Sequence, residues 1–298
     1  MPRSSHHVDV SHPDKVMYPD GGVTKRDVVD YYRRIAPVML PHIVNRPVTR
    51  IRYPNGTGEK SFYEKNAPKS TPDWVRTENV ATPGSTKGRD SLDYVVAEDA
   101  ESLAWMGNQA ALELHVPQWH FRGHRSSDRP DRLIADLDPG RGAGLDECVA
   151  TARLLRDRFA ADGLDPYVKS SGKHGIHVCC PIAGTQTDAT VSAYAKSVAV
   201  QLSTEHPSLV TARMPKAERE GKVFIDWSQN NAAKTTVAPY SLRGLNRATV
   251  SAPLTWDELD DPRMLPLGPN DVLDRVEKSG DLWSPLLEPG PTVPKVDG

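Results

Sequence analysis

The segment Arg132-Leu-Ile-Ala-Asp-Leu-Asp-Pro-Gly140 begins the most regular part of this 298-residue chain. Residues 132–138 are predicted to form a strand that Pro139 and Gly140 end. Five elements follow in the order helix, short strand, strand, helix and strand, at residues 145–162, 166–170, 176–181, 188–206 and 222–227. Gly163 is expected to close the first helix and Asp188 to cap the second. This order is the split βαβ or ferredoxin-like pattern, which predicts an α+β fold.

The expected topology also predicts where the polar residues of these strands meet. In a ferredoxin-like sheet the first strand is central, and the third and fourth strands flank it. By this fold-level analogy Asp136, Asp138, His177 and Asp226 come from three neighbouring strands. The fold itself is therefore expected to assemble a site from residues far apart in the sequence.

Three acids in this region are candidate metal ligands. Asp136 and Asp138 lie two residues apart on a strand, so both carboxylates leave the same face, with Cα atoms about 7 Å apart. Two like charges this close call for a cation, unless they are solvated at a strand end or paired with an arginine. Asp226 adds a third acid after the apolar run 223–225. Three converging carboxylates suit a pair of Mg²⁺ or Mn²⁺ ions and two-metal catalysis.

The turn Ser170-Ser-Gly-Lys-His-Gly175 has the composition of a phosphate-binding site. It offers hydroxyls, the side chains of Lys173 and His174, and backbone N–H groups that are expected to be free to point inward. The spacing differs from that of a P-loop. The alternative is that Gly172 and Gly175 only shape a hairpin and that His177 is a core histidine.

Two further groups of residues favour nucleotide and DNA binding. Lys234 lies in a polar loop after the third acid, and Arg243 next to a glycine could clamp a triphosphate through two hydrogen bonds. Phe62 and Tyr63 adjoin two lysines, an arrangement that suits base stacking on a basic surface. Adjacent aromatic residues can equally belong to a core.

Composition limits the class of protein. With 38% hydrophobic and 26% charged residues, the chain is long enough for one large domain or two closely packed ones. The net charge of -2 means that any nucleic-acid binding must use local basic patches, such as the one at Arg46, Arg50 and Arg52. The three cysteines are expected to be reduced and partly buried, and their number and spacing disfavour a zinc site. Neither a long apolar run nor a secretory signal is present in this sequence, so a cytoplasmic location without membrane contact is expected.

The first 125 residues are less regular. Thr24 is expected to cap a helix that runs to Met39 and is stopped by Pro41. An Arg-rich alternating segment follows at residues 46–53. Residues 82–91 lack periodicity and are predicted to form a mobile loop.

Together these features resemble the polymerase domain of bacterial ligase D, in the archaeo-eukaryotic primase superfamily. The similarity covers nearly the whole chain, and its motifs are specific. The matching segments are Asp136-Leu-Asp-Pro-Gly140, Ser171-Gly-x-x-Gly-x-His177, Val223-Phe-Ile-Asp-Trp-Ser-Gln-Asn230, Lys234-Thr-Thr236, Ala238-Pro-Tyr-Ser-Leu-Arg-Gly244, Asp14-Lys15-x-x-Tyr18-Pro19, Thr24-Lys25, Phe62-Tyr-Glu-Lys65 and His115-Val-Pro-Gln-Trp119. Two positions depart from the pattern: His174 stands where relatives have lysine, with Lys173 one position earlier, and Tyr63 replaces a phenylalanine.

The resemblance implies roles for these residues. Asp136, Asp138 and Asp226 would be the catalytic residues and would bind two Mn²⁺ or Mg²⁺ ions. The incoming nucleoside triphosphate would be held by His115, Ser171, Lys173, His174, His177, Lys234 and Arg243. Lys15 and Lys25 would grip a 5′-phosphate at a gap or end, and Phe62 and Tyr63 would stack on DNA. Arg52, Lys87 and Arg219 would make further DNA contacts.

The resemblance also implies one primase-polymerase domain over residues 1–298. Its parts would be an N-terminal αβ module at about 1–125, a palm-like catalytic module with the βαββαβ sheet at about 126–260, and a C-terminal extension with a Pro-rich tail at 261–298.

The expected activity is gap filling and end extension in non-homologous end joining, with ribonucleotides favoured and with Ku and a DNA ligase as partners. The chain would be either a stand-alone protein or an excised domain. The alternatives are a non-catalytic module that binds 5′-phosphorylated DNA ends, and a metal-dependent phosphoesterase or nuclease.

Overall fold

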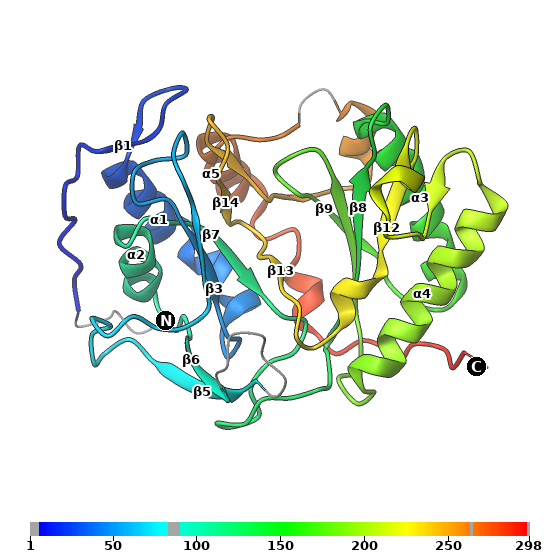
Figure 1. Cartoon of the computed structure of the whole chain (residues 1–298), viewed down its shortest axis with the longest axis horizontal. Helices are drawn as coiled ribbons and strands as arrows, with labels where there is room; N and C mark the ends of the chain where they lie inside the picture. Colours follow the sequence, from blue (N-terminus) through cyan, green and yellow to red (C-terminus); the bar gives the residue numbers. More distant parts are fainter. Residues whose placement is uncertain (1–5, 83–89, 263–264, 297–298) are drawn as a thin grey trace.

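The computed structural model describes residues 6–82, 90–262 and 265–296. Residues 83–89, which include Lys87 and most of the loop predicted at 82–91, lie outside the described residues. Two halves, each built around its own sheet, lie side by side (Figure 1). The α+β class expected from the sequence is confirmed.

The larger sheet has six strands in the order β11-β12-β8-β10-β9-β16. Its central four strands have the order predicted from the ferredoxin-like pattern, with β8 between β12 and β10. The strands are β8 Arg132–Pro139, β9 Tyr167–Ser170, β10 Ile176–Pro181, β11 Val210–Thr211, β12 Val223–Asp226 and β16 Pro253–Leu254. All neighbours except the parallel pair β11 and β12 are antiparallel.

Helices α3 (Leu145–Ala161) and α4 (Asp188–Glu205) cover one face of this sheet (Figure 1). The alternation along β8 explains this arrangement. Its Leu133, Ala135 and Leu137 belong to the main hydrophobic core together with α3 and α4 side chains, whereas Asp136 and Asp138 point to the opposite face. The sheet therefore has one helix-covered apolar face and one face that carries the acids.

The smaller sheet has the order β13-β7-β3-β4. It contains β3 Thr49–Arg52, β4 Phe62–Glu64, β7 Ala111–Val116 and β13 Thr236–Val237. Helices α1 (Lys25–Ile43) and α2 (Ala100–Asn108) pack against each other beside it. Strand β13 follows β12 in the chain but pairs with β7, so a late segment of the sequence completes the smaller sheet. The two halves are thereby joined at the edge where the acids lie.

Two helix boundaries differ from the prediction. Helix α1 does not stop at Pro41 but continues through Pro37 and Pro41 to Ile43. Each proline removes one backbone hydrogen bond, but Met39, Leu40 and Ile43 are buried, and this packing holds the last turns helical. The cap of α4 is Thr187, not Asp188, since the Thr187 hydroxyl accepts from the N–H of Thr190 at 3.3 Å. The predicted Thr24 cap of α1 is confirmed, with a reciprocal bond to Asp27.

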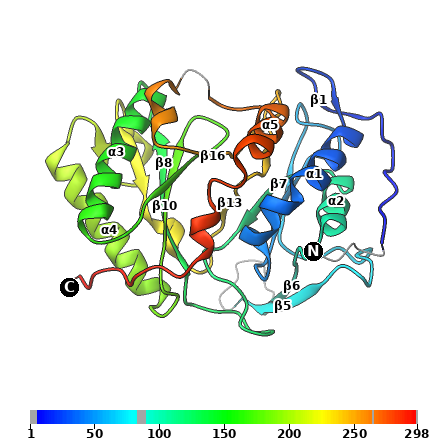
Figure 2. The same ribbon diagram turned by 180° about the vertical axis from the view of Figure 1, so that it is seen from behind.

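The remaining elements are short, apart from one helix. They are the pairs β1 (Val16–Tyr18) with β2 (Val23–Thr24), β5 (Thr77–Ala81) with β6 (Ser91–Val95), and β14 (Leu242–Arg243) with β15 (Thr249–Val250), the helix α5 (Pro269–Ser279), and the 3-10 turns η1 (Lys216–Arg219), η2 (Trp227–Asn230), η3 (Asp257–Asp260) and η5 (Ser284–Leu287). Figure 2 shows α5 and the segment after it lying between the two halves. Trp283 and Leu286 from this segment pack on Ile134 and Cys179, that is, on the acid-bearing face of the large sheet.

Two expectations from composition concern the whole chain. The three cysteines are free, as predicted, and all three are buried, which is more than the partial burial expected. Among the described residues, no helix combines the length and the apolar character that a membrane span needs.

Candidate active site

The register of the large sheet sets the predicted site residues in one row. His177 on β10 lies opposite Asp136 on β8, and Asp226 on β12 lies opposite Asp136 from the other side. Directly opposed residues in antiparallel strands point to the same face. The three neighbouring strands therefore bring Asp136, Asp138, His177 and Asp226 together on the face away from α3 and α4, as the sequence predicted.

Asp136 is held by a histidine. Its Oδ1 lies 3.1 Å from Nε2 of His177, a residue that is 3% exposed. Burial acts to raise the pKa of Asp136, but attraction to His177 and to the more distant Lys169 and Arg243 outweighs it, so this pKa lies below its ordinary value. Asp136 is thus a carboxylate in the folded chain.

Asp138 has the opposite character. Burial raises its pKa to about 7, with further contributions from the negative charges of Asp136 and Asp226. Crowded carboxylates of this kind are the usual sign that a cation belongs between them. The carboxylate oxygens and the negative charge of Asp136 and Asp138 fit a hard divalent metal ion.

Asp226 is oriented by the turn that follows it. Its Oδ1 accepts from the N–H of Ser228 at 3.1 Å, and its Oδ2 accepts from Nε2 of Gln229 at 2.8 Å. The Ser228 hydroxyl also donates to Asp226 and accepts from Nζ of Lys234. Within the described part of the chain, no group of three or more His, Cys, Asp or Glu side chains is arranged to hold a metal ion. The predicted convergence of three carboxylates is therefore not seen as a formed metal cluster among the described residues, and the assignment of Asp136, Asp138 and Asp226 as metal ligands stays a prediction.

A cavity of about 440 Å³ is lined by Asp136 and Asp138, whereas Asp226 is not among its lining residues. It contains six of the seven predicted nucleotide-binding residues, namely His115, Ser171, Lys173, His174, His177 and Arg243. The seventh, Lys234, is not among the lining residues, although Thr235 and Thr236 beside it are. Lys216 and Arg219 of η1 also line the cavity, so its lysines and arginines come from three separate segments: the turn at 170–175, η1 and β14.

The turn at residues 170–175 differs from the prediction in one respect. The hydroxyl of Ser171 accepts from the N–H groups of Lys173 (3.2 Å) and Gly175 (3.0 Å), and that of Ser170 accepts from the N–H of Gly172 (2.9 Å). The expectation that these amides point freely inward is therefore wrong, because nearby serine side chains already satisfy them. Gly172 has φ +73°, and a Cβ there would lie 2.7 Å from Cγ of Arg243, so glycine is required.

Arg243 is fixed between this turn and the smaller sheet. Its Nη1 donates to the carbonyl of Ser171 at 2.9 Å, and its Nη2 lies 3.3 Å from Oε2 of Glu113. The side chain is mostly buried, yet it reaches the cavity. A planar cation held in this way can bind phosphate oxygens with little loss of conformational entropy.

Glu113 is the residue that the sequence prediction missed. It is 1% exposed on β7, and its carboxylate contacts His115 (3.0 Å), Lys173 (3.2 Å) and Arg243 (3.3 Å). Burial opposes ionisation, but these cations and hydrogen bonds hold the pKa of Glu113 well below its usual range. A single buried acid thus arranges three of the predicted triphosphate ligands. The only signal in the sequence was an acid two residues before His115 in an otherwise apolar strand.

A second cluster of cations lies at the start of α1. Nζ of Lys25 is 2.9 Å from both the carbonyl and the hydroxyl oxygen of Ser11, and the residue is 8% exposed. Burial lowers the pKa of Lys25, and the neighbouring charges of Lys15 and Arg52 lower it further. Three cations are therefore gathered here, as a site for an anion requires. Of the other members of the predicted Arg-rich patch, Arg46 and Arg50 are buried in ion pairs with Asp131 and Glu64.

Phe62 and Tyr63 on β4 are 51% and 54% exposed, which excludes the alternative that they belong to a core. Tyr63 points toward the cavity, since its hydroxyl lies 3.3 Å from Oγ1 of Thr235. Nζ of Lys60 lies 6.0 Å from the Phe62 ring centre. Exposed rings beside cations form a surface suited to stacking bases. The guanidinium carbon of Arg219 lies 3.7 Å from the ring centre of Phe224, and Arg219 also lines the cavity.

Comparison with known proteins agrees with this geometry. The family described as the LigD primase-polymerase domain matches residues 24–283. The chain belongs to this family. It is 44% identical over 289 residues to a multifunctional non-homologous end joining protein LigD of Mycolicibacterium smegmatis, covering 97% of this chain and 37% of that protein. A bifunctional LigD of Bacillus subtilis is 32% identical, over 90% of this chain and 42% of that protein.

The solved polymerase domain of Mycobacterium tuberculosis ligase D, in complex with DNA, superposes with a TM-score of 0.89. It is 42% identical, and the match covers 94% of this chain and 98% of that one. The chain thus spans about two fifths of the length of its curated LigD relatives and nearly all of a solved LigD polymerase domain. The LigD primase-polymerase family consists of nucleotidyltransferases whose catalysis depends on metal ions.

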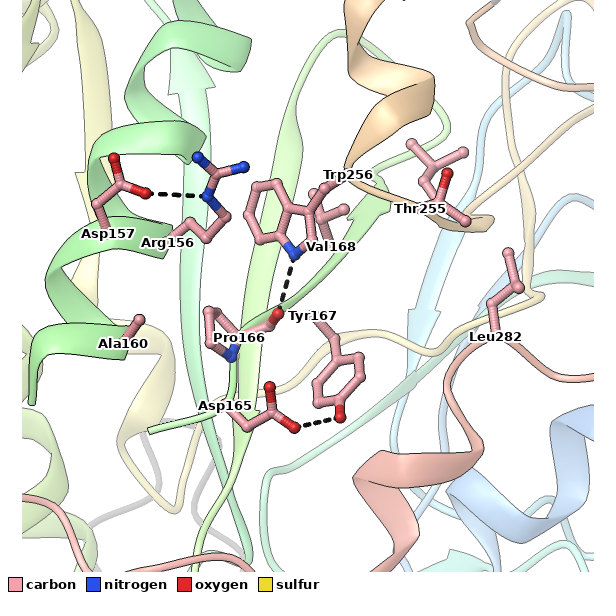
Figure 3. A pocket seen from close by; sticks show the side chains of 11 residues that line it. Arg156, Asp157, Ala160, Asp165, Pro166, Tyr167, Val168, Thr255, Trp256 and Leu282 are labelled. Atoms are coloured by element: carbon pink, nitrogen blue, oxygen red, sulfur yellow. Dashed lines mark hydrogen bonds and ion pairs between the residues drawn. The ribbon is translucent and has the colours of Figure 1, made fainter. Parts of the chain in front are cut away.

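A second hollow of about 460 Å³ lies beside α3 and the edge strand β16 of this LigD-type fold (Figure 3). Its charged groups are already paired: Arg156 with Asp157, and Asp165 with the hydroxyl of Tyr167. The Trp256 ring lies under the Arg156 guanidinium, and its N–H donates to the carbonyl of Pro166 at 3.0 Å. None of the predicted site residues lines this hollow, so the acid-bearing cavity is the candidate active site.

Proposed function

We propose that the chain is a DNA-dependent nucleotidyltransferase that fills gaps and extends ends during double-strand break repair by non-homologous end joining, and that it favours ribonucleotides. The observation that carries this proposal is one cavity in which Asp136 and Asp138 face a set of cations, including Lys173 and Arg243. A triphosphate carries more negative charge than the single phosphate group on which a nuclease or phosphoesterase acts, so several fixed cations opposite the carboxylates favour a polymerase. A polymerase uses them to hold a triphosphate.

In this reaction a 3′-hydroxyl attacks the α-phosphate of a bound nucleotide, and pyrophosphate leaves. Asp136 and Asp138, with Asp226 beside them, would hold Mn²⁺ or Mg²⁺, which often binds through one or two carboxylates and the substrate phosphates. When bound, two such ions supply activation of the hydroxyl and neutralisation of the developing charge. His177 keeps Asp136 oriented and ionised through their 3.1 Å contact.

The nucleotide is oriented by the opposite wall of the cavity. Arg243 and Lys173 would bind the phosphate oxygens, and His115 would line the nucleotide pocket. Glu113 holds all three in place, as its contacts of 3.0 to 3.3 Å indicate. The serine-capped turn at 170–175 supports Lys173 and His174 as a fixed surface beneath the phosphates. Lys234, through Ser228, would stabilise Asp226 in place of a direct triphosphate contact.

DNA would lie across β4 and the start of α1. Phe62 and Tyr63 would stack on the template or primer, and Lys15, Lys25 and Arg52 would bind the 5′-phosphate on the far side of a gap. Arg219 at the cavity rim and Lys87 would contact the ends. A related polymerase domain was solved in complex with DNA, which supports DNA as the ligand.

We also propose the assembly that the curated relatives suggest. Their names describe multifunctional or bifunctional end-joining proteins. A Ku protein and a DNA ligase would be the partners of this polymerase. It would act in the cytoplasm. Residues 126–260 would form the palm-like catalytic module, residues 1–125 the N-terminal module and residues 261–298 a C-terminal extension of one domain.

The test is extension of a labelled primer on gapped DNA with a downstream 5′-phosphate. Reactions contain Mn²⁺ or Mg²⁺ and either ribo- or deoxynucleotides, and the Asp138→Asn chain is run in parallel. Metal-dependent addition by the unsubstituted chain, faster with ribonucleotides, is the expected result.

A second candidate function is non-catalytic binding of 5′-phosphorylated DNA ends. It is favoured by one observation: Asp226 has both carboxylate oxygens occupied by Ser228 and Gln229. Tight DNA binding without nucleotide addition under either metal would make this the better account.

Replacing Lys25 with alanine is expected to remove the preference for a downstream 5′-phosphate. A hydrogen bond to a charged group contributes about 1.5–3 kcal/mol, so the affinity for phosphorylated gapped DNA should fall roughly tenfold or more. Affinity for the same DNA without the phosphate should change little. Lys278→Ala, an exposed lysine of α5, is the control for general loss of positive charge. An unchanged ratio of the two affinities in Lys25→Ala would assign the phosphate contact elsewhere.

A further inference from the structure

Lys169 on β9 lies on the acid-bearing face of the large sheet. Its cross-strand neighbour on β10 is His177. His177 in turn lies opposite Asp136 on β8, and Asp136 lies opposite Asp226 on β12. One row across four strands therefore carries Lys169, His177, Asp136 and Asp226 on the same side. With strands about 4.8 Å apart, the Cα atoms of Lys169 and Asp136 are separated by roughly 10 Å. Lys169 thus belongs to the site by position, although it does not line the cavity.

The ammonium group of Lys169 is buried without an acid. The residue is 1% exposed, and its Nζ donates to the hydroxyl of Ser251 and lies 5.8 Å from the Trp283 ring centre. No carboxylate among the described residues forms an ion pair with it. Burial lowers the pKa of Lys169 to about 7; repulsion from Arg243 acts in the same direction, and the Cys179 thiol and Asp136 oppose it. Lysine is rarely fully buried without such a partner, because the charge is costly to desolvate.

Trp283 separates Lys169 from solvent. The indole is 2% exposed, and its Nε1–H donates to the carbonyl of Val168 at 3.0 Å. The charge therefore acts through protein and not through water, and its field reaches His177 and Asp136. A contact path also exists: Ser251 donates to the carbonyl of Ser170, and the Ser170 hydroxyl accepts from the N–H of Gly172 in the turn.

We propose that Lys169 is a positioning residue for the incoming nucleotide, a buried amine behind His177 and Arg243 whose positive charge is favoured by the bound triphosphate. This proposal rests on the proposed function. It explains why the folded chain keeps a buried amine that makes no ion pair with an acid among the described residues: the bound triphosphate adds negative charge to the distant attraction of Asp136. Lys169 touches neither the nucleotide nor the metal ligands, and it acts through the turn and through the electrostatic field of the site.

The experiment compares Lys169→Met, which removes both the charge and the donor, with Lys169→Gln, which removes the charge but keeps a donor for Ser251. Each chain is assayed for the apparent KM and kcat for nucleotide on gapped DNA, for the Kd of that DNA, and for Tm. We expect both variants to raise the nucleotide KM roughly tenfold, with kcat changed less than threefold and DNA affinity unchanged. Tm should stay the same or rise, since an uncompensated buried charge has been removed.

The outcomes separate the explanations. Recovery of the normal KM by Lys169→Gln would show that only the hydrogen bond to Ser251 matters and would overturn the proposal. A normal KM in both variants, or a large fall in Tm for Lys169→Met, would overturn it as well, because the latter marks a structural role. If the unsubstituted chain adds no nucleotide, the proposed function fails. If it adds nucleotide and the variants match it, only the role of Lys169 fails.

Discussion

Asp138→Asn is expected to reduce nucleotide addition about a thousandfold or more, because a two-metal site that loses one carboxylate loses several kcal/mol of transition-state stabilisation. Asparagine keeps the size of the side chain and one oxygen donor, so the cavity keeps its shape. The substitution also removes one charge from a crowded set, in which Asp136 and Asp226 both raise the pKa of Asp138. We therefore expect an unchanged or higher Tm together with nearly complete loss of extension.

The measurement is single-turnover extension of a gapped primer across a range of Mn²⁺ concentrations, with DNA affinity measured on the same preparation. Asp274→Asn, an exposed acid of α5, is the matched control and should behave like the unsubstituted chain. Unaffected extension by Asp138→Asn would refute the metal assignment. A parallel loss of DNA binding would instead show that the substitution disturbs the DNA surface.

The central sheet could be predicted because its signals are local and agree with one another. β10 was predicted with its observed bounds, and β8 and β12 to within one residue at each end. Once the strand order followed from the βαββαβ pattern, the meeting of Asp136, His177 and Asp226 followed from topology alone. The prolines of α1 misled the prediction because proline is weighed locally, whereas burial of Met39 and Ile43 is a tertiary effect.

The wall opposite the acids was less predictable. Its organising residue, Glu113, lies in a different sheet from Asp136, and β13 crosses from the half that contains Asp136 to pair with β7. No periodicity in the sequence reports that crossing. The same holds for Ser170 and Ser171, whose hydroxyls were expected to face phosphate but instead cap the amides of their own turn. Side-chain hydrogen bonding of this kind depends on the folded backbone.

Glu113→Ala is expected to have the second large effect, on both stability and nucleotide binding. Removing the acid leaves Lys173 and Arg243 without their shared buried counter-charge, and breaking a buried ion pair costs about 3–5 kcal/mol. For a chain of this size we expect Tm to fall by roughly 6 °C or more. The nucleotide KM should rise at least about tenfold, because the two cations lose the group that aims them into the cavity.

Glu113→Gln separates charge from shape, because it keeps the volume and the hydrogen-bonding length. The folded-state pKa of Glu113 is depressed, since attraction to His115, Arg243 and Lys173 exceeds the effect of burial. Its contribution to stability is therefore fully present above the unfolded pKa of about 4.3 and is lost as pH falls toward the folded value. The stability deficit of Glu113→Gln should be largest near neutral pH and should narrow below pH about 4. Urea unfolding between pH 3 and pH 7, with the exposed Glu277→Gln as control, measures this. A deficit that does not change with pH would mean that Glu113 acts through packing and not as the counter-charge of the nucleotide-binding cations.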